Sequence, residues 1–181
     1  ARAWSYDASV WPIATTTPLR AARAGTLYNL RRHEEAIEEC RAIFGRDPQS
    51  AAAHKVAALC YAYKLDFESA FQHFKKALEL DPRDDSILAN YAALLQRTGK
   101  LNDAWECAKR AVELNPKNAH ARLVRGMILL EQERLTEAEA EFKAGLELDP
   151  KHATGHLNYG RLLARMGRRT EAIAEFVGPD N

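Results

Sequence analysis

The sequence predicts an all-α fold, an α-solenoid of five stacked helix-turn-helix repeats, and three observations lead to this prediction. The 181 residues are 46% hydrophobic and 28% charged, which is an ordinary globular composition. Proline returns with a period of 34 residues along most of the chain. Apolar residues return at helical spacing between the prolines. We therefore expect a chain built by repetition, in which each helix pair packs on its neighbours.

Proline marks the period most clearly, because each copy follows Asp or Asn. The periodic prolines are Pro48, Pro82, Pro116 and Pro150. Proline disfavours a helical conformation in the residue before it, so each of these pairs is expected to end a helix. Two residues later, Ser50, Asp84 and Asn118 provide side-chain oxygens suited to cap the next helix.

Small residues recur where two helices must approach each other closely. Alanine stands twelve residues before each periodic proline and once more in the same register, at Ala36, Ala70, Ala104, Ala138 and Ala172. Another small residue stands twenty-four residues before, at Ala24, Ala58, Ala92, Gly126 and Gly160. A larger side chain at such a position would overpack the contact by about 1 to 3 kcal/mol. Gly99 and Gly167 predict the turn inside two repeats, and Thr17-Pro18 predicts a cap followed by the first helical residue.

The predicted repeat domain covers residues 17–177, and shorter segments flank it. Its repeats are expected at about residues 17–50, 51–84, 85–118, 119–152 and 153–177. Residues 1–16 are aromatic and non-repetitive, so we expect a segment that caps the first repeat, covers the groove or contacts a neighbouring molecule. Residues 178–181 are expected to form a tail. The chain starts without Met and no capping helix follows the fifth repeat, which predicts a longer natural protein or a homo-oligomer through this end or the N-terminal segment.

An A-x-x-x-F pattern then completes a family resemblance. It is present at Ala70–Phe74, Ala138–Phe142 and Ala172–Phe176, and together with the period, the small residues and the closing proline it resembles the tetratricopeptide repeat. The chain departs from the family at the first consensus position, usually Trp, where it has Arg20, His54, Leu88, Arg122 and His156. The resemblance implies a right-handed superhelix whose first helices line a concave groove for an extended peptide or a partner helix.

The resemblance also implies which side chains line that groove. They are Tyr28, Lys55, Val56, Leu59, Tyr63, Asn90, Arg97, Val124, Met127, Asn158, Arg161 and Arg165, and Asn29, Gln96, His120, Leu123 and Glu131 lie on the same face. An asparagine amide offers a ligand backbone both a donor and an acceptor, or bonds water in an empty groove. An arginine can hold a carboxylate by two parallel hydrogen bonds, or be solvated. We expect a protein or peptide partner with acidic groups and apolar anchors.

One well-known specificity of the family is not expected in this chain. The clamp for the carboxyl-terminal EEVD of heat-shock chaperones uses Lys and Asn in one repeat, Asn in the next, and Lys and Arg in the third. In the first three repeats, Ala21 and Gly25 replace the first Lys and Asn. One repeat later, Leu59 replaces that Asn and Val124 replaces the final Arg.

Charge, cysteine content and hydropathy exclude several classes of protein. There are 26 basic and 25 acidic residues, so bulk electrostatics gives no reason to expect a nucleic-acid partner. An RNA-binding helical repeat is a less favoured alternative, because that family has a period of about 35 residues. The longest apolar run, residues 56–63, is far shorter than the roughly 18 residues of a membrane span. Three scattered cysteines and no glycosylation sequon favour a cytoplasmic setting.

The sequence contains no motif that favours catalysis, a metal or a cofactor. His152 and His156 are four residues apart, but His152 is expected at a helix cap and no further metal-binding side chain follows. We therefore predict a non-enzymatic protein–protein interaction module, a scaffold or adaptor. The alternative is the interaction domain of a larger enzyme, such as a transferase or a phosphatase.

Overall fold

The computed structural model describes residues 16–177, and all regular secondary structure in this range is helical. The chain divides into two compact bodies, residues 1–82 and 83–181, called here the first body and the second body. Most of the N-terminal segment and all of the predicted tail lie outside the described residues. Within the described range, no helix is long and apolar enough to cross a membrane.

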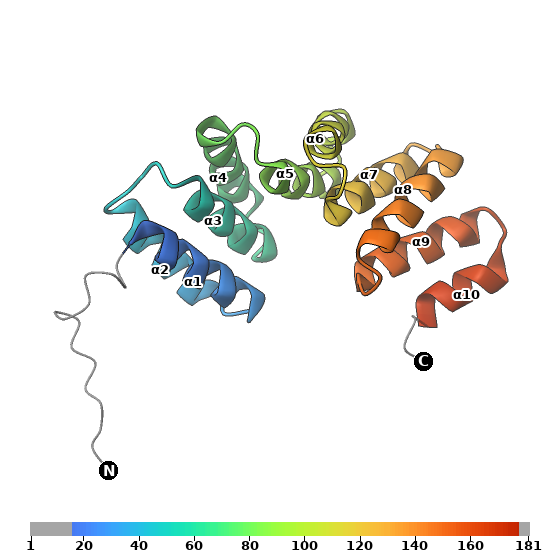
Figure 1. Ribbon diagram of the computed structural model, residues 1–181, viewed down its shortest axis with the longest axis horizontal. Coiled ribbons are helices and arrows are strands. Elements are labelled where there is room, and N and C mark those ends of the chain that lie inside the picture. The colour runs from blue at the N-terminus through green and yellow to red at the C-terminus, as the bar shows by residue number, and fades with distance from the viewer. Residues whose placement is uncertain (1–15, 178–181) are drawn as a thin grey trace, which may run out of the picture. The chain divides into compact units, whose positions relative to one another are not determined.

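The first body contains two helix pairs within its described part (Figure 1). They are α1 (Thr17–Asn29) with α2 (His33–Phe44), and α3 (Ala51–Tyr63) with α4 (Phe67–Leu80). Both α1 and α2 also contact α3, so the second pair stacks on the first. The small positions Ala24 and Ala58 are completely buried, as are Cys40 and Phe74 from the second helices of the pairs.

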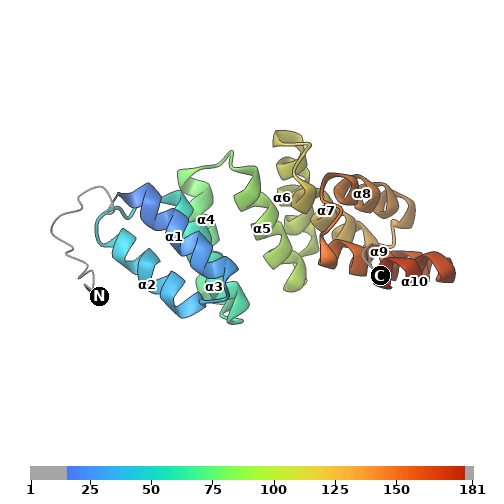
Figure 2. The ribbon, with the colours of Figure 1, turned by 60° about the horizontal axis from the view of Figure 1, so that its bottom comes forward.

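The second body contains three helix pairs in the range that is described (Figures 1 and 2). They are α5 (Asp85–Arg97) with α6 (Leu101–Leu114), α7 (Ala119–Glu131) with α8 (Leu135–Leu148), and α9 (Ala153–Arg165) with α10 (Arg169–Val177). The first helices also contact each other in sequence, α5 with α7 and α7 with α9. This arrangement is the helical repeat solenoid that the sequence predicts.

Glycine at the small position lets the two helices of a pair approach each other. A Cβ atom placed on Gly126 would lie 3.2 Å from the ring of Phe142, which is completely buried. A Cβ atom placed on Gly160 would lie 2.4 Å from the ring of Phe176. In both pairs the phenylalanine of the A-x-x-x-F pattern therefore fills the space that the missing side chain leaves.

The predicted caps are confirmed, with one correction at the first helix. Ser50, Asp84 and Asn118 each accept a hydrogen bond from the backbone N–H three residues later, at 3.3, 2.9 and 2.9 Å. The cap of α1 was predicted wrongly: Thr16 occupies it without a side-chain hydrogen bond, and Thr17 is already helical. Pro18 lies in the first turn, where its missing N–H costs nothing.

Polar side chains replace tryptophan packing at the first consensus position. His54 Nε2, Arg122 Nε and His156 Nε2 lie 3.2, 2.8 and 2.9 Å from the carbonyl oxygen of the closing proline six residues earlier. Each of these hydrogen bonds ties the start of a first helix to the loop before it. Although these residues differ from the family consensus, they still connect the first helix to the preceding loop, by hydrogen bonds.

The four polar residues at this first consensus position, Arg20 among them, also reach the second helix of their pair, each at a residue nineteen positions later. The contacts are Arg20–Glu39 at 3.6 Å, His54–His73 at 2.9 Å, Arg122–Glu141 at 3.5 Å and His156–Glu175 at 2.6 Å. Burial lowers the pKa of both His54 and His73. At His156 burial opposes protonation, but the hydrogen bonds to Glu175 and the Pro150 carbonyl outweigh it and raise the pKa.

The turn inside every helix pair contains one residue in the left-handed region, again with a period of 34. These residues are Arg31, Leu65, Gly99, Glu133 and Gly167, with φ between 60° and 79°. The glycine turns predicted at Gly99 and Gly167 are confirmed. The other three turns hold an L side chain in a conformation that costs about 1 to 2 kcal/mol.

The turn geometry predicts the effect of adding a side chain at Gly99. A Cβ atom there would meet no other atom within 4 Å, so Gly99→Ala changes only the backbone preference. We expect the free energy of unfolding to fall by about 1 kcal/mol in urea denaturation. Gly45→Ala is the matched control, because its φ is −66° and its Cβ would lie 3.8 Å from the nearest atom. Equal stability of the two variants would contradict the left-handed backbone conformation at Gly99.

The histidine contacts predict opposite pH dependence for two variants. Because the pKa values of His54 and His73 are lowered, their contribution to the free energy of unfolding is fully present above the ordinary pKa of 6.5. This contribution is lost as the pH falls below 6.5. The raised pKa of His156 means that its contribution is complete below 6.5 and is lost as the pH rises through the folded-state value. His156→Gln should therefore cost about 1 kcal/mol more near pH 5 than near pH 8. The stability of His73→Gln relative to the wild type should instead rise as the pH falls. Thermal melts between about pH 5 and pH 8 measure both differences. If the two variants changed in the same direction with pH, the opposite pKa shifts of His73 and His156 would be refuted.

Candidate functional site

A cavity of about 520 Å³ in the second body brings several predicted groove residues together. Residues of α5, α7, α9 and α10 and of the turn after α7 form its wall. They are Gln96, Met127, Leu130, Glu131, Glu133, Asn158, Arg161, Ala164, Arg165 and Phe176. The size is that of a site for a few side chains of a ligand.

One wall of the cavity carries a buried amide and an arginine on α9. Asn158 is only 4% exposed, and its Nδ2 donates to the Thr154 carbonyl oxygen at 2.9 Å. Its Oδ1 accepts a hydrogen bond from Arg161 Nη1 at 3.1 Å. Within residues 16–177, Arg161 makes no ion pair with a carboxylate. Among the described residues, the positive charge that Arg161 brings to this wall is held by the Asn158 amide and by no carboxylate.

The facing wall is acidic, and it neutralises the second arginine. Arg165 Nη1 lies 2.7 Å from Glu133 Oε1 and 3.4 Å from the Leu130 carbonyl oxygen. Gln96 Nε2 donates a hydrogen bond to Glu131 Oε1, which joins α5 to α7. Glu133 holds its position through a left-handed backbone, with φ at 60°. Among its described residues the cavity lining thus carries two arginines and two glutamates: Arg165 and Glu133 form an exposed ion pair, and Arg161 and Glu131 are each hydrogen-bonded to an amide.

The remaining lining is apolar and differs in exposure. Met127 is half-buried and Leu130 is buried, whereas Ala164 is exposed. Phe176 is 50% exposed and borders the cavity from α10. A ligand at this site would therefore meet apolar surface next to the charged groups.

Four of the predicted groove residues of the second body lie at the cavity, and three do not. Met127, Asn158, Arg161 and Arg165 line it, as do Gln96 and Glu131 from the wider prediction. Val124 is 1% exposed and lies in the helix packing, where it offers almost no surface to a ligand. Asn90 Nδ2 donates to the Ser86 carbonyl oxygen at 2.7 Å, and Arg97 is exposed in the last turn of α5. Neither of these two borders the cavity.

The predicted groove residues of the first body lie on α1 and α3. The rings of Tyr28 and Tyr63 flank the buried ring of His33, with centroid distances of 5.4 and 3.9 Å. Val56 is buried at 6% exposure, whereas Lys55 and Leu59 are half-buried. The aromatic contact fixes the two tyrosines, and the role of these five residues in binding stays a prediction.

Sequence reasoning did not include four residues of the cavity wall. Leu130, Glu133, Ala164 and Phe176 lie outside the groove positions that the resemblance implied. Glu133 lies 34 residues after Gly99, at the same turn position of the next repeat. This period is the feature of the sequence from which its place in a turn could have been predicted. Phe176 belongs to the A-x-x-x-F pattern, which served only as a mark of the family, and its other members Phe74 and Phe142 are completely buried.

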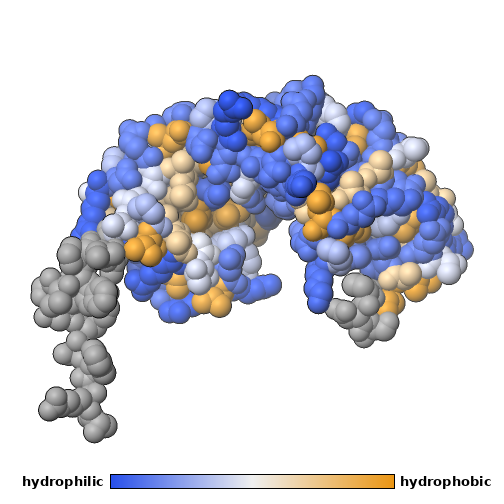
Figure 3. Space-filling view, in the orientation of Figure 1, coloured by the Kyte–Doolittle hydropathy of each residue, from blue (hydrophilic) through white to orange (hydrophobic). Residues whose placement is uncertain are grey.

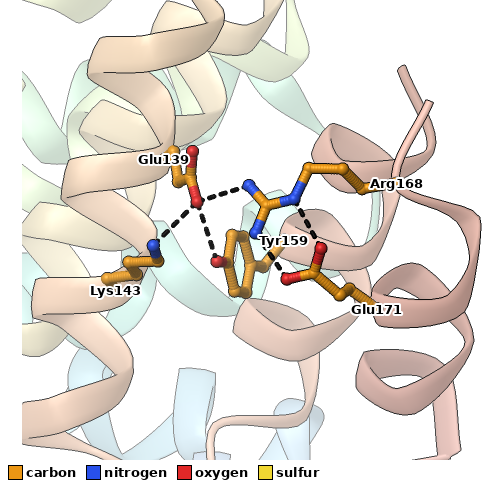
Figure 4. Close-up of polar contacts among 5 residues, drawn as sticks. All are labelled: Glu139, Lys143, Tyr159, Arg168 and Glu171. Atoms are coloured by element: carbon orange, nitrogen blue, oxygen red, sulfur yellow. Dashed lines mark hydrogen bonds and ion pairs between the residues drawn. The ribbon is translucent and has the colours of Figure 1, made fainter. Parts of the chain in front are cut away.

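An ion-pair network links α8, α9 and α10 through side chains that are not part of the cavity lining (Figure 4). Glu139 Oε1 lies 2.8 Å from Lys143 Nζ and 2.7 Å from Arg168 Nη1, and it accepts a hydrogen bond from Tyr159 OH at 3.3 Å. Arg168 also pairs with Glu171 at the start of α10. Hydrogen bonds from Lys143 and Arg168 lower the pKa of Glu139 to about 2.

His152 and His156, at the start of α9, make hydrogen bonds to different partners. His152 caps the helix, because its Nδ1 accepts the hydrogen bond of the Gly155 N–H at 3.0 Å. His156 instead bonds Glu175 on α10. Within the described part of the chain, no three His, Cys, Asp or Glu side chains are grouped to hold a metal ion.

Comparison with protein families identifies the repeat. A family model described as tetratricopeptide repeat matches residues 21–85, 92–153 and 130–177. A second model with the same description matches residues 73–106. These matches cover well over half of the chain.

Individual relatives match shorter stretches. The Hsp70-Hsp90 organizing protein of Triticum aestivum is 44% identical over 57 residues, which are 32% of this chain and 10% of that protein. The probable biofilm formation methyltransferase WspC of Pseudomonas putida is 33% identical over 78 residues, which are 43% of this chain and 18% of that protein. The similarity therefore spans only about a tenth to a fifth of the length of these relatives.

A solved structure is similar over most of its length. YrrB, described as a TPR protein with an unusual peptide-binding site, has a TM-score of 0.62 and 27% sequence identity to this chain. The alignment covers 88% of this chain and 82% of YrrB.

The network behind the cavity predicts an acid-dependent loss of stability. Glu139→Gln keeps the size of the side chain but removes the charge that Lys143 and Arg168 share. We expect the free energy of unfolding to fall by about 1 to 3 kcal/mol at neutral pH. The lowered pKa of Glu139 means that its contribution is lost as the pH falls from 4.5 towards about 2, so the variant and the wild type should converge there. Glu147→Gln on the exposed surface of α8 is the control, and an equal effect at both positions would rule out the network.

Proposed function

The chain belongs to the tetratricopeptide repeat family and is a protein-interaction module, and we propose that it binds an extended peptide segment of a partner protein along the first helices of its repeats. The second body would provide the main binding site. In the first body, Tyr28, Lys55, Val56, Leu59 and Tyr63 are the proposed counterparts on α1 and α3.

The cavity of the second body is the observation that carries this proposal. It lies against the first helices α5, α7 and α9, and its lining combines apolar and charged side chains. Met127 and Leu130 offer an apolar floor, while Asn158 and Arg161 offer polar groups beside it. Peptide sites commonly join main-chain hydrogen bonds with pockets for individual side chains.

The position of Arg161 on α9 favours an acidic group on the part of the peptide that lies against this wall. Arg161 is exposed, and its hydrogen bond to Asn158 Oδ1 orients the guanidinium without neutralising it. A carboxylate can take up two parallel hydrogen bonds from such a group. Arg165 would be a weaker contact, because a ligand would first have to displace Glu133. We therefore assign the acidic group of the ligand to Arg161 and its apolar anchor to Met127.

The relatives support peptide binding in different ways. YrrB is described by its peptide-binding site, and its similarity extends over 88% of this chain. The Hsp70-Hsp90 organizing proteins point to chaperone partners, but Ala21, Gly25, Leu59 and Val124 occupy positions of the family's chaperone-tail clamp here. We therefore propose a scaffold or adaptor with a ligand other than that tail.

A second candidate is the interaction domain of a larger enzyme. The stretch that is 33% identical to the probable methyltransferase WspC favours it. In that case the repeats would bind a protein partner and a separate domain would carry the catalysis. The complete reading frame of the natural protein decides this point, because it either encodes such a domain or does not.

Selection of peptides provides the test of the site. A library of random peptides displayed on phage is selected against the chain, and the recovered peptides are measured by fluorescence anisotropy. We expect acidic and apolar residues to be enriched, and Arg161→Ala to weaken binding about 10-fold or more, because a charge-assisted hydrogen bond is worth about 1.5 to 3 kcal/mol. Met127→Ala should also weaken it.

Arg169→Ala is the matched control, since Arg169 is an exposed arginine of α10 that does not line the cavity. Equal affinity of the wild type and the Arg161 variant for every selected peptide would exclude the proposed site. Thermal melts show whether each variant remains folded.

A further inference from the structure

The last helix pair exposes apolar side chains whose counterparts one repeat earlier are buried. Leu157 on α9 is 52% exposed, whereas Leu123, its counterpart on α7, is 2% exposed. Phe176 on α10 is 50% exposed, whereas Phe142, its counterpart on α8, is completely buried. Ile173 and Val177 extend this surface, and apolar surface is visible at the α10 end in Figure 3.

The structure shows what covers the buried counterparts. A Cβ atom on Gly155 of α9 would lie 3.0 Å from Leu123, so this part of α9 packs directly on that side chain. The ring of Tyr159 lies 6.1 Å from the ring of Phe142. Leu123 and Phe142 are therefore covered by the first helix of the following repeat. The surface formed by Leu157 and Phe176 has the same origin and is shaped for another first helix.

The opposite end of the repeat array exposes the matching half of this interface. The counterparts of Gly155 on the earlier first helices are Ala121, Ile87 and Ala53, and all of them are completely buried. On α1 the same position is Leu19, which is 51% exposed. Arg23 on α1 corresponds to Tyr159, and its side chain is 68% exposed. Within the described residues, the first helix thus exposes an apolar residue at the point where the other first helices pack on a preceding repeat, next to Arg23, which pairs with Glu39 of its own repeat at 2.9 Å.

We propose that this chain associates with a second copy of itself head to tail, with α1 of one copy packed on α9 and α10 of the next. Leu19 would take the place of Gly155 and cover Leu157, and Arg23 would lie over the ring of Phe176. An arginine over an aromatic face adds a favourable cation–π contact. The contact joins two different surfaces. A dimer therefore still has one free α1 surface and one free surface of α9 and α10, so further copies can add and form a filament.

This proposal does not depend on the peptide site, and the variants that test it avoid the cavity lining. Leu19→Glu and Leu157→Glu each place a charge at one end, and both positions are about half exposed, so the fold should tolerate them. Leu148→Glu is the control, because Leu148 is 43% exposed on α8 and belongs to neither end. Sedimentation velocity over a range of concentrations reports the size distribution of the 181-residue chain.

We expect the wild type and Leu148→Glu to grow beyond the dimer as the concentration rises. Each end variant alone should stay monomeric, because an unpaired buried charge weakens association by about 100-fold or more. An equimolar mixture of the two end variants should form dimers and nothing larger, since each retains the end that the other lacks.

Three results would overturn the proposal. A wild type that stays monomeric at high concentration excludes self-association of this chain. Dimers of Leu19→Glu alone would show a symmetric contact between two C-terminal ends. A mixture that stays monomeric while the wild type assembles would place the contact on another surface.

Discussion

The close approach of the two helices in each pair is the constraint on which the rest of the structure depends. In the last two pairs a glycine on the first helix faces a phenylalanine on the second, Gly126 with Phe142 and Gly160 with Phe176, whereas the first and third pairs have the smaller Cys40 and Ala108 at the phenylalanine position. The phenylalanine fills the gap, and in the inner pair its far side receives Tyr159 of the following repeat. One packing rule therefore builds the pair and also prepares the surface for the next pair. The same rule explains why an end of the array exposes apolar surface when no further repeat covers it.

The proposed binding surface follows from this packing and from a separate set of polar contacts. First helices that contact each other in sequence bring Met127 of α7 next to Asn158 and Arg161 of α9, which are far from it along the chain. The ion-pair network around Glu139 links α8 to α9 and α10 through side chains outside the cavity lining. The net charge of the whole chain is +1, which is close to zero. At the cavity, the charge that a ligand meets depends on which side chains of the lining are paired with each other. Within the described residues, Arg165 pairs with Glu133, whereas Arg161 is hydrogen-bonded to the amide of Asn158.

The repeat architecture could be predicted because its signals are local and periodic. The prolines, the small residues and the caps at Ser50, Asp84 and Asn118 each act within one repeat, and the helices follow them closely. The wall of the cavity was harder to predict, because pairings between repeats decide it. That Val124 is buried and that Glu133 neutralises Arg165 both depend on how neighbouring repeats stack, which no single 34-residue pattern contains. The polar links at His54, Arg122 and His156 could not be predicted for a different reason, because a departure from the tryptophan consensus does not indicate which backbone carbonyl the replacing side chain contacts.

The central claim is that helix pairing presents the first helices of the second body as the ligand surface. A crystal structure of the chain in complex with its tightest selected peptide tests this claim most directly. We predict that the peptide lies along α5, α7 and α9, with an acidic group at Arg161 and an apolar side chain against Met127. A peptide bound on the outer surface of α6 or α8, with the cavity empty, would contradict the claim.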